Sequence, residues 1–163
     1  MENLFVPVSG TWRQVSPRLA TVRRIEIGAA AGVVILAGVA LLVLLGDLRW
    51  IGGVVGAAGL VGAAWGWAWA GRNQRSWGYT ENADDLLVTR GVMFKRLVAI
   101  PYGRMQFVDV QAGPLARAFG IATVTLHTAS TETAADIPGL ASAEATRLRN
   151  RLTELGEARG AGL

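Results

Sequence analysis

Two long runs of residues without an ionisable side chain occupy the first half of the chain. The first extends from Ile27 to Leu45 and the second from Trp50 to Gly71. Each is close to the length of about 20 apolar residues that crosses the hydrocarbon core of a bilayer. The pattern therefore predicts two transmembrane helices, at about 27–45 and 50–70, within a membrane segment that covers 25–71.

Three other interpretations of these runs fit the sequence less well. A secretory signal peptide is disfavoured because the first run is longer than a signal core of roughly 7–15 residues and a second apolar run follows at once. A buried hairpin in a soluble protein is disfavoured because two adjacent stretches of spanning length are rare in soluble domains. No charged residue lies inside either run, which argues against an ion path, a proton relay or a transporter.

Charged and aromatic residues at the ends of the runs predict the orientation of the hairpin. The connector Gly46–Arg49 carries one charge of each sign, whereas arginines gather before the first run and after the second. These arginines are Arg13, Arg18, Arg23, Arg24, Arg72 and Arg75. Because basic residues stay on the cytoplasmic side, both termini are expected there, including a basic N-terminal segment over 1–24. Four tryptophans are expected to anchor the helices, Trp50 at the outer interface and Trp65, Trp67 and Trp69 at the inner one.

Small residues recur along the second run and are expected to line one face of the helix, which we call the seam. The seam consists of Gly52, Gly56, Gly59, Ala63 and Gly66. Such seams let two helix backbones approach closely. Gly28 and Gly32 of the first run have the same spacing, so the other arm of the hairpin is the simplest partner, and a helix of another chain is the alternative.

After the second run the pattern changes to short segments separated by turn residues, which predicts a cytoplasmic domain over 72–156. Strands are expected at 77–80, 85–90, 95–101, 104–111, 122–128 and 133–137, the last ending at Pro138–Gly139. Imperfect alternation in 104–111 indicates a bulge or burial on both faces, and 113–120 leaves room for about one helical turn. Apolar residues at Ala141, Ala145, Leu148, Leu152 and Leu155 predict a closing amphipathic helix. A flexible tail is expected over 157–163.

The residue types present exclude several kinds of chemistry. The chain has no cysteine, so it has no disulfide, thiolate metal site or catalytic cysteine. Its one histidine, His127, has no acidic cluster near it in the sequence, and the pair Asp84–Asp85 lies beside a turn. Phosphate-binding loops, nucleophile elbows and zinc-protease motifs are absent. We therefore expect no enzymatic activity, no cofactor and no metal site.

The net charge of +4 adds little beyond membrane topology. The arginines between Arg13 and Arg24 lie beside the first apolar run, where they are explained by orientation in the membrane rather than by nucleic-acid binding.

An ordered set of short segments in the domain resembles one family. After an opening Trp77 and Tyr79 come Leu86–Gly91, Ala99–Pro101, Met105–Val108, Gly113–Gly120 and Ile137–Gly139, and then the closing helix. In this order they resemble the YdbS-like membrane-anchored bacterial pleckstrin-homology (PH) domain family, which also places two transmembrane helices before the domain. The resemblance implies an α+β membrane protein, with a two-helix transmembrane hairpin followed by a PH-like bent antiparallel β-sheet or open barrel and a C-terminal amphipathic helix. It also implies an interaction module of the bacterial cytoplasmic membrane, with no catalytic residues.

The turn expected between strands 85–90 and 95–101 combines apolar and basic residues. They are Arg90, Val92, Met93, Phe94, Lys95 and Arg96. An apolar tip with a basic collar suits a loop that dips into an anionic membrane surface. The alternative is that the apolar side chains pack against the domain or a partner. Three further arginines, Arg147, Arg149 and Arg151, are expected on a solvated face of the closing helix.

The expected function is that of a non-enzymatic inner-membrane protein whose cytoplasmic PH-like domain serves as a protein-interaction or scaffold module at the bilayer. A role in envelope homeostasis is suggested for some members of the family. The expected partners are membrane lipids, a membrane protein such as a larger protein with several PH domains, and a second copy of the chain, but not nucleic acid. One alternative is a module that recognises anionic lipid. Another is an accessory subunit of a membrane protease or exporter, for which a five-stranded barrel with a free C-terminal tail is expected.

Overall fold

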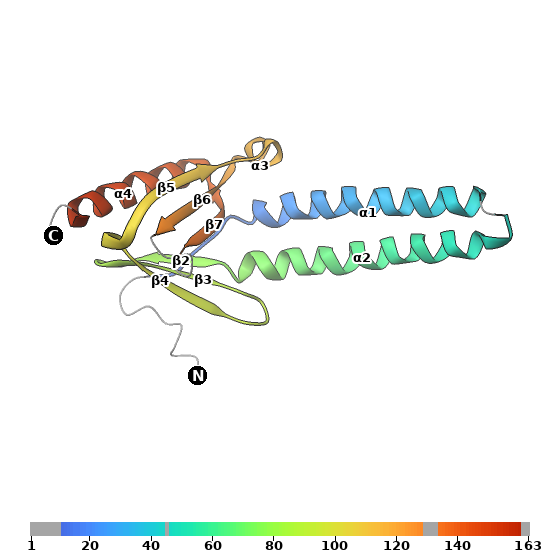
Figure 1. The fold of residues 1–163 in the computed structure, drawn as a ribbon, viewed down its shortest axis with the longest axis horizontal. Coiled ribbons are helices and arrows are strands. Elements are labelled where there is room, and N and C mark those ends of the chain that lie inside the picture. Colours follow the sequence, from blue (N-terminus) through green and yellow to red (C-terminus); the bar gives the residue numbers. More distant parts are fainter. Residues whose placement is uncertain (1–10, 45, 129–133, 161–163) are drawn as a thin grey trace. The chain divides into compact units, whose positions relative to one another are not determined.

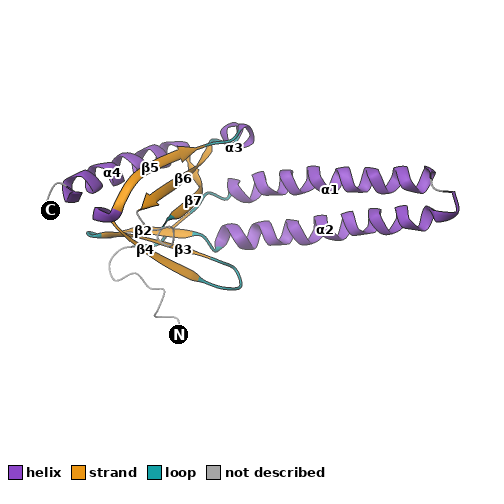
Figure 2. Cartoon of the chain, viewed as in Figure 1, coloured by secondary structure: helices purple, strands orange, loops and turns teal. Residues whose placement is uncertain are grey.

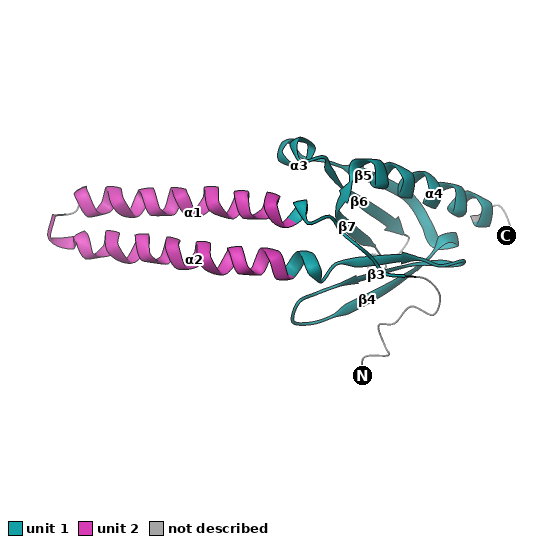
Figure 3. Ribbon diagram, turned by 180° about the vertical axis from the view of Figure 1, so that it is seen from behind, with its two compact units in different colours: residues 1–19, 73–163 teal, residues 20–72 magenta. Residues whose placement is uncertain are grey.

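The computed structural model describes residues 11–44, 46–128 and 134–160 and divides into two compact units (Figure 3). One unit combines Met1–Leu19 with Asn73–Leu163, and the other is Ala20–Arg72. The elements in chain order (Figure 1) are β1 Arg13–Gln14, α1 Arg18–Leu44, η2 Gly46–Leu48, α2 Arg49–Arg75, β2 Gly78–Glu81, β3 Asp85–Arg90, β4 Arg96–Pro101, η3 Tyr102–Arg104, β5 Met105–Gln111, α3 Pro114–Ala118, β6 Ile121–Thr128, β7 Ala135–Ala141 and α4 Ser142–Gly160. All described strands belong to the first unit, whereas the second is helical (Figure 2).

Helices α1 and α2 form the two arms of the predicted hairpin. Both are long and apolar enough to cross a membrane, and both extend beyond the runs that predicted them, α1 from Arg18 and α2 to Arg75. Only 6% of the most apolar window of α1 and 11% of that of α2 is buried. Core helices of soluble proteins are mostly buried, so this exposed apolar surface disfavours a soluble hairpin and fits helices covered by lipid.

Glycines bring the backbones of the two arms into contact. A Cβ atom added to Gly38 of α1 would lie 2.6 Å from the backbone nitrogen of Gly56 in α2. One added to Gly52 would lie 2.4 Å from the backbone nitrogen of Leu42. Real side chains never come this close, so only glycine fits at Gly38 and Gly52, and the helices pack backbone to backbone there.

Other members of the seam continue along the same face of α2. A Cβ atom added to Gly59 or Gly66 would lie 2.9 and 2.8 Å from isoleucine side chains of α1, and Ala63 between them is half-buried. The expectation that Gly28 and Gly32 supply the facing surface is wrong. A Cβ atom added to either meets nothing within 4 Å, and Gly38 makes the close approach instead.

The membrane hairpin is inserted in the chain between two paired strands of the domain. β1 pairs antiparallel with β2, with Arg13 opposite Tyr79 and Gln14 opposite Gly78. The expectation of a separate N-terminal segment over 1–24 is therefore wrong, because β1 is an edge strand of the sheet. A strand of two residues carries too little alternation to be seen in the sequence.

A buried hydrogen bond joins the two segments of the domain that precede and follow the membrane hairpin. The amide Nε2 of Gln74, at the end of α2, donates a hydrogen bond of 2.9 Å to the carbonyl oxygen of Val15, just after β1. Both residues are buried. The backbone N–H of Ser16 donates to the carbonyl oxygen of Gly139 at 2.9 Å. The carbonyl oxygen of Val15 and the N–H of Ser16 lie just after β1, outside its strand pairing, and these bonds give each of them a partner.

The domain packs two antiparallel sheets, with strand orders β1-β2-β3-β4 and β5-β6-β7. The predicted irregularity of 104–111 is confirmed as a register shift between Met105 and Phe107. The expectation that the last strand ends at Pro138–Gly139 is wrong, because β7 continues to Ala141. Pro138 and Gly139 lie together opposite Thr123 in a bulge, where the missing N–H of proline and the φ of +72° at Gly139 are both tolerated.

Helix α4 covers the second sheet, as the amphipathic pattern predicted, but the expectation that Ala141 belongs to its apolar face is wrong, because Ala141 ends β7 and is exposed. Ala145, Leu148 and Leu152 are fully buried, and the helix contacts η3, β5, β6 and β7. A helix packed across the sheet supports the PH-like fold and not a barrel with a free tail. The flexible tail expected over 157–163 is wrong for its first part, because α4 continues to Gly160. Residues 161–163 lie outside the described residues.

A polar cluster fastens the start of α4 to the first sheet. Glu144 accepts hydrogen bonds from the hydroxyl of Tyr79 at 2.6 Å and from the guanidinium of Arg13 at 2.9 Å. Arg147, one turn later, donates to Glu144 and to Glu81 of β2. The hydrogen bond from Arg147, followed by those from Tyr79 and Arg13, lowers the pKa of Glu144 to about 2.

We expect Gln74→Ala to loosen the edge of the sheet at which β1 joins β2. The substitution leaves the buried carbonyl of Val15 without its donor, at a cost of about 1–3 kcal/mol. Amide exchange of β1 and β2 should accelerate by roughly 5- to 150-fold, as measured by hydrogen–deuterium exchange of the full chain in detergent. Gln106→Ala, at an exposed site on β5, is the matched control. Equal exchange in the two variants would contradict this role for Gln74.

We expect acid to weaken the domain through Glu144. Its pKa falls from 4.5 to about 2 in the folded state, so its stabilising contribution is complete above about pH 4.5 and is lost as the pH falls toward 2. Between these values the melting temperature of the wild-type protein should therefore fall more steeply than that of Glu144→Gln. Glu154→Gln, on the exposed face of α4, should keep the wild-type slope. The opposite order of the two slopes would refute the assignment.

Candidate functional site

The β3–β4 hairpin ends in a tip of three exposed apolar side chains. Met93 and Phe94 are 85% and 84% exposed, and Val92 is exposed as well. The alternative that these side chains pack against the domain is therefore wrong. Gly91 makes the turn with a φ of +109°, and a Cβ atom added there would lie 1.9 Å from the carbonyl oxygen of Phe94. The turn therefore requires glycine.

Basic residues surround this tip, as the sequence pattern suggested. Arg90 ends β3, Lys95 follows the tip, and Arg96 begins β4 opposite Arg90. The guanidinium of Arg90 lies 5.8 Å from the ring centre of Trp77, a cation–π distance. The six residues predicted as a contact surface thus form one continuous structure, which we call the tip: Arg90, Val92, Met93, Phe94, Lys95 and Arg96.

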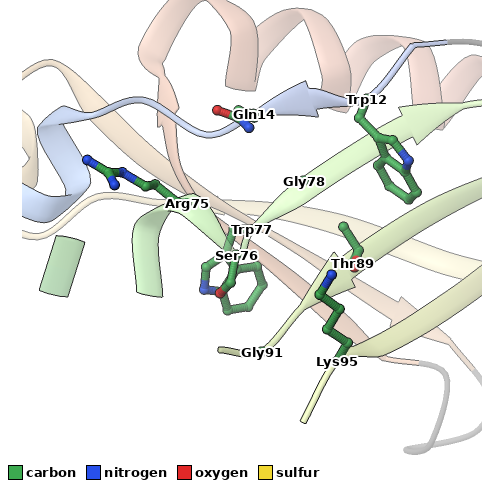
Figure 4. Close-up of a pocket in the computed structure, with 9 residues that line it drawn as sticks. All are labelled: Trp12, Gln14, Arg75, Ser76, Trp77, Gly78, Thr89, Gly91 and Lys95. Carbon is green, nitrogen blue, oxygen red and sulfur yellow. The ribbon is translucent and has the colours of Figure 1, made fainter. Parts of the chain in front are cut away.

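A basic hollow of about 260 Å³ opens at the base of the tip. Figure 4 shows the residues around it, which are Trp12, Gln14, Arg75, Ser76, Trp77, Gly78, Thr89, Gly91 and Lys95. None of these lining residues is acidic, two are cationic, and the rest offer aromatic rings or hydrogen-bonding groups. The lining suits a negatively charged group.

Sequence reasoning missed this hollow because its walls come from three separated segments. Trp12 and Gln14 precede the membrane hairpin, Arg75 to Gly78 follow it, and Thr89 to Lys95 belong to the β3–β4 hairpin. The β1–β2 pairing and the hydrogen bond from Gln74 to Val15 bring the first two segments together. The one signal in the sequence was that a tryptophan and an arginine precede the first apolar run and that another such pair follows the second.

A groove of about 420 Å³ lies between β5 and α4. Its walls are Met105, Gln106, Phe107, Val108, Leu152, Thr153, Gly156 and Glu157. Phe107 is 57% exposed and stacks on His127, with ring centres 4.1 Å apart. Because β5 is an edge strand of its sheet, this groove borders a strand edge.

The polar residues considered for catalysis have structural partners instead. Asp85 accepts a hydrogen bond from the side chain of Asn82 at 2.8 Å, within the turn before β3. Asp84 pairs with Arg159 of α4. Within the described residues, no three histidine or acidic side chains gather as metal ligands. Of the three α4 arginines expected on a solvated face, Arg147 is instead tied to Glu81 and Glu144.

The four predicted anchor tryptophans lie on the surface of the membrane hairpin. Trp50, Trp65, Trp67 and Trp69 are between 43% and 77% exposed. Arginine side chains of α1 make cation–π contacts with the rings of Trp67 and Trp69, near the end of α2.

Comparison with known proteins agrees with this architecture. The family model described as Bacterial PH domain matches residues 14–156, a range that begins within β1 and includes the inserted hairpin. The chain is also similar to the UPF0699 transmembrane protein YdbS of Bacillus subtilis (strain 168), with 31% identity over 146 residues that cover 87% of this chain and 91% of the relative. Neither description names an enzymatic activity. No solved structure matches the chain. The family resemblance drawn from the sequence is thus confirmed, and the chain belongs to the bacterial PH domain family, among membrane proteins related to YdbS.

Proposed function

We propose that this protein is a non-enzymatic interaction module of the cytoplasmic membrane, whose PH-like domain docks on the anionic surface of the bilayer through its tip. The observation that carries the proposal is the exposure of Met93 and Phe94 between three basic residues. Exposed apolar side chains in a cluster mark a contact surface. The basic collar favours an anionic surface as the partner over a neutral one.

The charge pattern supports a position on the inner face of the membrane. Arginines flank the outer ends of both apolar runs, whereas the connector has balanced charge. The positive-inside rule then places both termini and the domain in the cytoplasm. Anionic lipids give the cytoplasmic leaflet a negative surface potential, which is the surface that Arg90, Lys95 and Arg96 suit.

Tethering makes a weak contact sufficient. Each basic residue near an anionic surface contributes about 1 kcal/mol, and insertion of the two apolar side chains adds to this. A total of about 4–5 kcal/mol corresponds to a dissociation constant of roughly 0.2–1 mM. Since the domain is linked directly to a transmembrane helix, it meets the surface at an effective concentration on the order of millimolar. The tip can therefore be bound to the membrane surface for much of the time and still dissociate from it.

We expect a probe at position 94 to report contact with anionic lipid. The natural chain lacks cysteine, so Phe94→Cys allows one environment-sensitive fluorophore to be attached to the full-length protein in nanodiscs. The emission should shift to the blue in phosphatidylglycerol discs and much less in phosphatidylcholine discs, because the probe enters the lipid interface beside the basic collar. High salt should reverse the shift.

Two further variants make this test decisive. Asn150→Cys, at an exposed site of α4, should give the same emission in both lipids. Adding Lys95→Glu and Arg96→Glu to the Phe94→Cys protein should remove the shift. A signal at 94 that ignores lipid charge and both substitutions would overturn lipid docking and leave a protein partner as the ligand of the tip.

A second candidate function, a scaffold for a protein partner, is supported by the groove between β5 and α4. Phe107 stands exposed on β5, an edge strand whose outer side pairs with no other strand among the described residues. Edge strands bind extended segments of other proteins through their backbone groups. In this function the tip orients the domain and the groove holds the partner.

We expect Phe107→Asp to release a protein partner that the full-length protein retains in mild detergent. The substitution places a charge in the apolar part of the groove, and loss of an aromatic anchor costs about 2 kcal/mol or more, or at least about 30-fold in affinity. Affinity purification with mass spectrometry measures the retained protein. Phe94→Asp is the control and should keep the partner. Loss with Phe94→Asp but not with Phe107→Asp would transfer the role to the tip.

A further inference from the structure

Two neighbouring arginines of the membrane hairpin lie within cation–π distance of tryptophan rings. Arg23 and Arg24 lie in α1, just before its long apolar stretch. The guanidinium of Arg24 lies 5.0 Å from the ring centre of Trp67, and that of Arg23 lies 5.7 Å from that of Trp69. Both tryptophans are near the end of α2, so the two helices together build this cluster.

The cluster holds more hydrogen-bond donors than the described chain satisfies. A guanidinium has five N–H groups and no acceptor. Nη1 of Arg23 and Nε of Arg24 are buried and have no hydrogen-bond partner in the part of the chain that the structure describes. Both arginines are only half-buried as residues, and a cation–π contact covers the face of a guanidinium, so its other N–H groups are the part that an anion would bind.

The local charge also lacks balance. Arg23 and Arg24 are adjacent cations, and Arg72 adds a third basic residue at the end of α2. Glu26 is the one acidic residue near them in the sequence, and no ion pair among the described residues joins it to either arginine. Glu26 acts electrostatically on Arg23, but one carboxylate does not balance these basic residues, and the positive charge that is left favours an anion with several oxygens.

We propose that Arg23 and Arg24, oriented by Trp69 and Trp67, bind the phosphate group of an anionic phospholipid. Tryptophan rings at the end of a transmembrane helix lie at the depth of lipid headgroups, and basic pockets between such helices bind anionic headgroups. A zwitterionic lipid also carries a phosphate, but its ammonium group is repelled by the two arginines. The site belongs to the hairpin and goes beyond the proposed function, because it does not require docking of the tip.

The test measures lipid retained by the purified full-length protein. The protein is exchanged into detergent with equal amounts of phosphatidylglycerol and phosphatidylcholine, and bound lipid is counted by native mass spectrometry. The wild-type protein should retain phosphatidylglycerol preferentially. Arg23→Gln with Arg24→Gln should lower this retention at least about tenfold, which is the effect of losing charge-assisted hydrogen bonds. Arg49→Gln, an exposed arginine beside Trp50 at the other end of the hairpin, is the matched control and should retain the wild-type amount.

Two further arms separate a built site from charge alone and from free phosphate. Arg23→Lys with Arg24→Lys keeps the charge but not the planar fork, and should lose most of the retention while its helical circular dichroism stays unchanged. Excess inorganic phosphate should displace little of the lipid. Equal retention in the lysine and wild-type proteins, equal losses at Arg49 and at Arg23–Arg24, or full displacement by inorganic phosphate would each overturn the assignment. Met93→Ser with Phe94→Ser should leave retention unchanged, so failure of tip docking and failure of this site are distinguishable.

Discussion

The pairing of β1 with β2 is the constraint on which the rest of the domain depends. The chain leaves the sheet after Gln14 and returns at Gly78, with the whole membrane hairpin between these points. Closing such a long loop is entropically costly, but two helices in backbone contact at Gly38 and Gly52 already hold its ends near each other. The hairpin thus lowers the cost of the pairing, and Gln74 satisfies the carbonyl that this edge would otherwise leave buried and unpaired.

Other parts of the domain are held together by contacts between residues that are distant in the sequence. The fully buried face of α4 seals the second sheet, and Glu144 connects the same helix to both strands that flank the membrane insertion. Polar side chains that resembled an acidic site, Asp84 and Asp85, serve the turn and an ion pair. These two acidic residues therefore have structural roles in the described domain.

The apolar side chains that the domain leaves outside its core are concentrated at two places. One is the tip, where Met93 and Phe94 are almost fully exposed. The other is the groove beside β5, where Phe107 rests on His127 rather than in the core. In the functions proposed above, each of these small surfaces makes a weak contact that a free domain would not sustain. A domain attached to a transmembrane helix can use them, because attachment supplies the local concentration that weak contacts need.

The sequence by itself determined the elements whose pattern is long and local. Two apolar runs, the alternation of 122–128 and the spacing of Leu148 and Leu152 were enough for the hairpin, a strand and the closing helix, because such periodicities report burial directly. Only the tertiary structure decided that β1 joins the sheet, that Gly38 and not Gly28 meets the seam, and that β7 passes through its proline. It alone assembled the basic hollow and the arginine–tryptophan cluster. These features join segments separated by the hairpin or by several strands, and pairing across such distances depends on three-dimensional packing that no local pattern encodes.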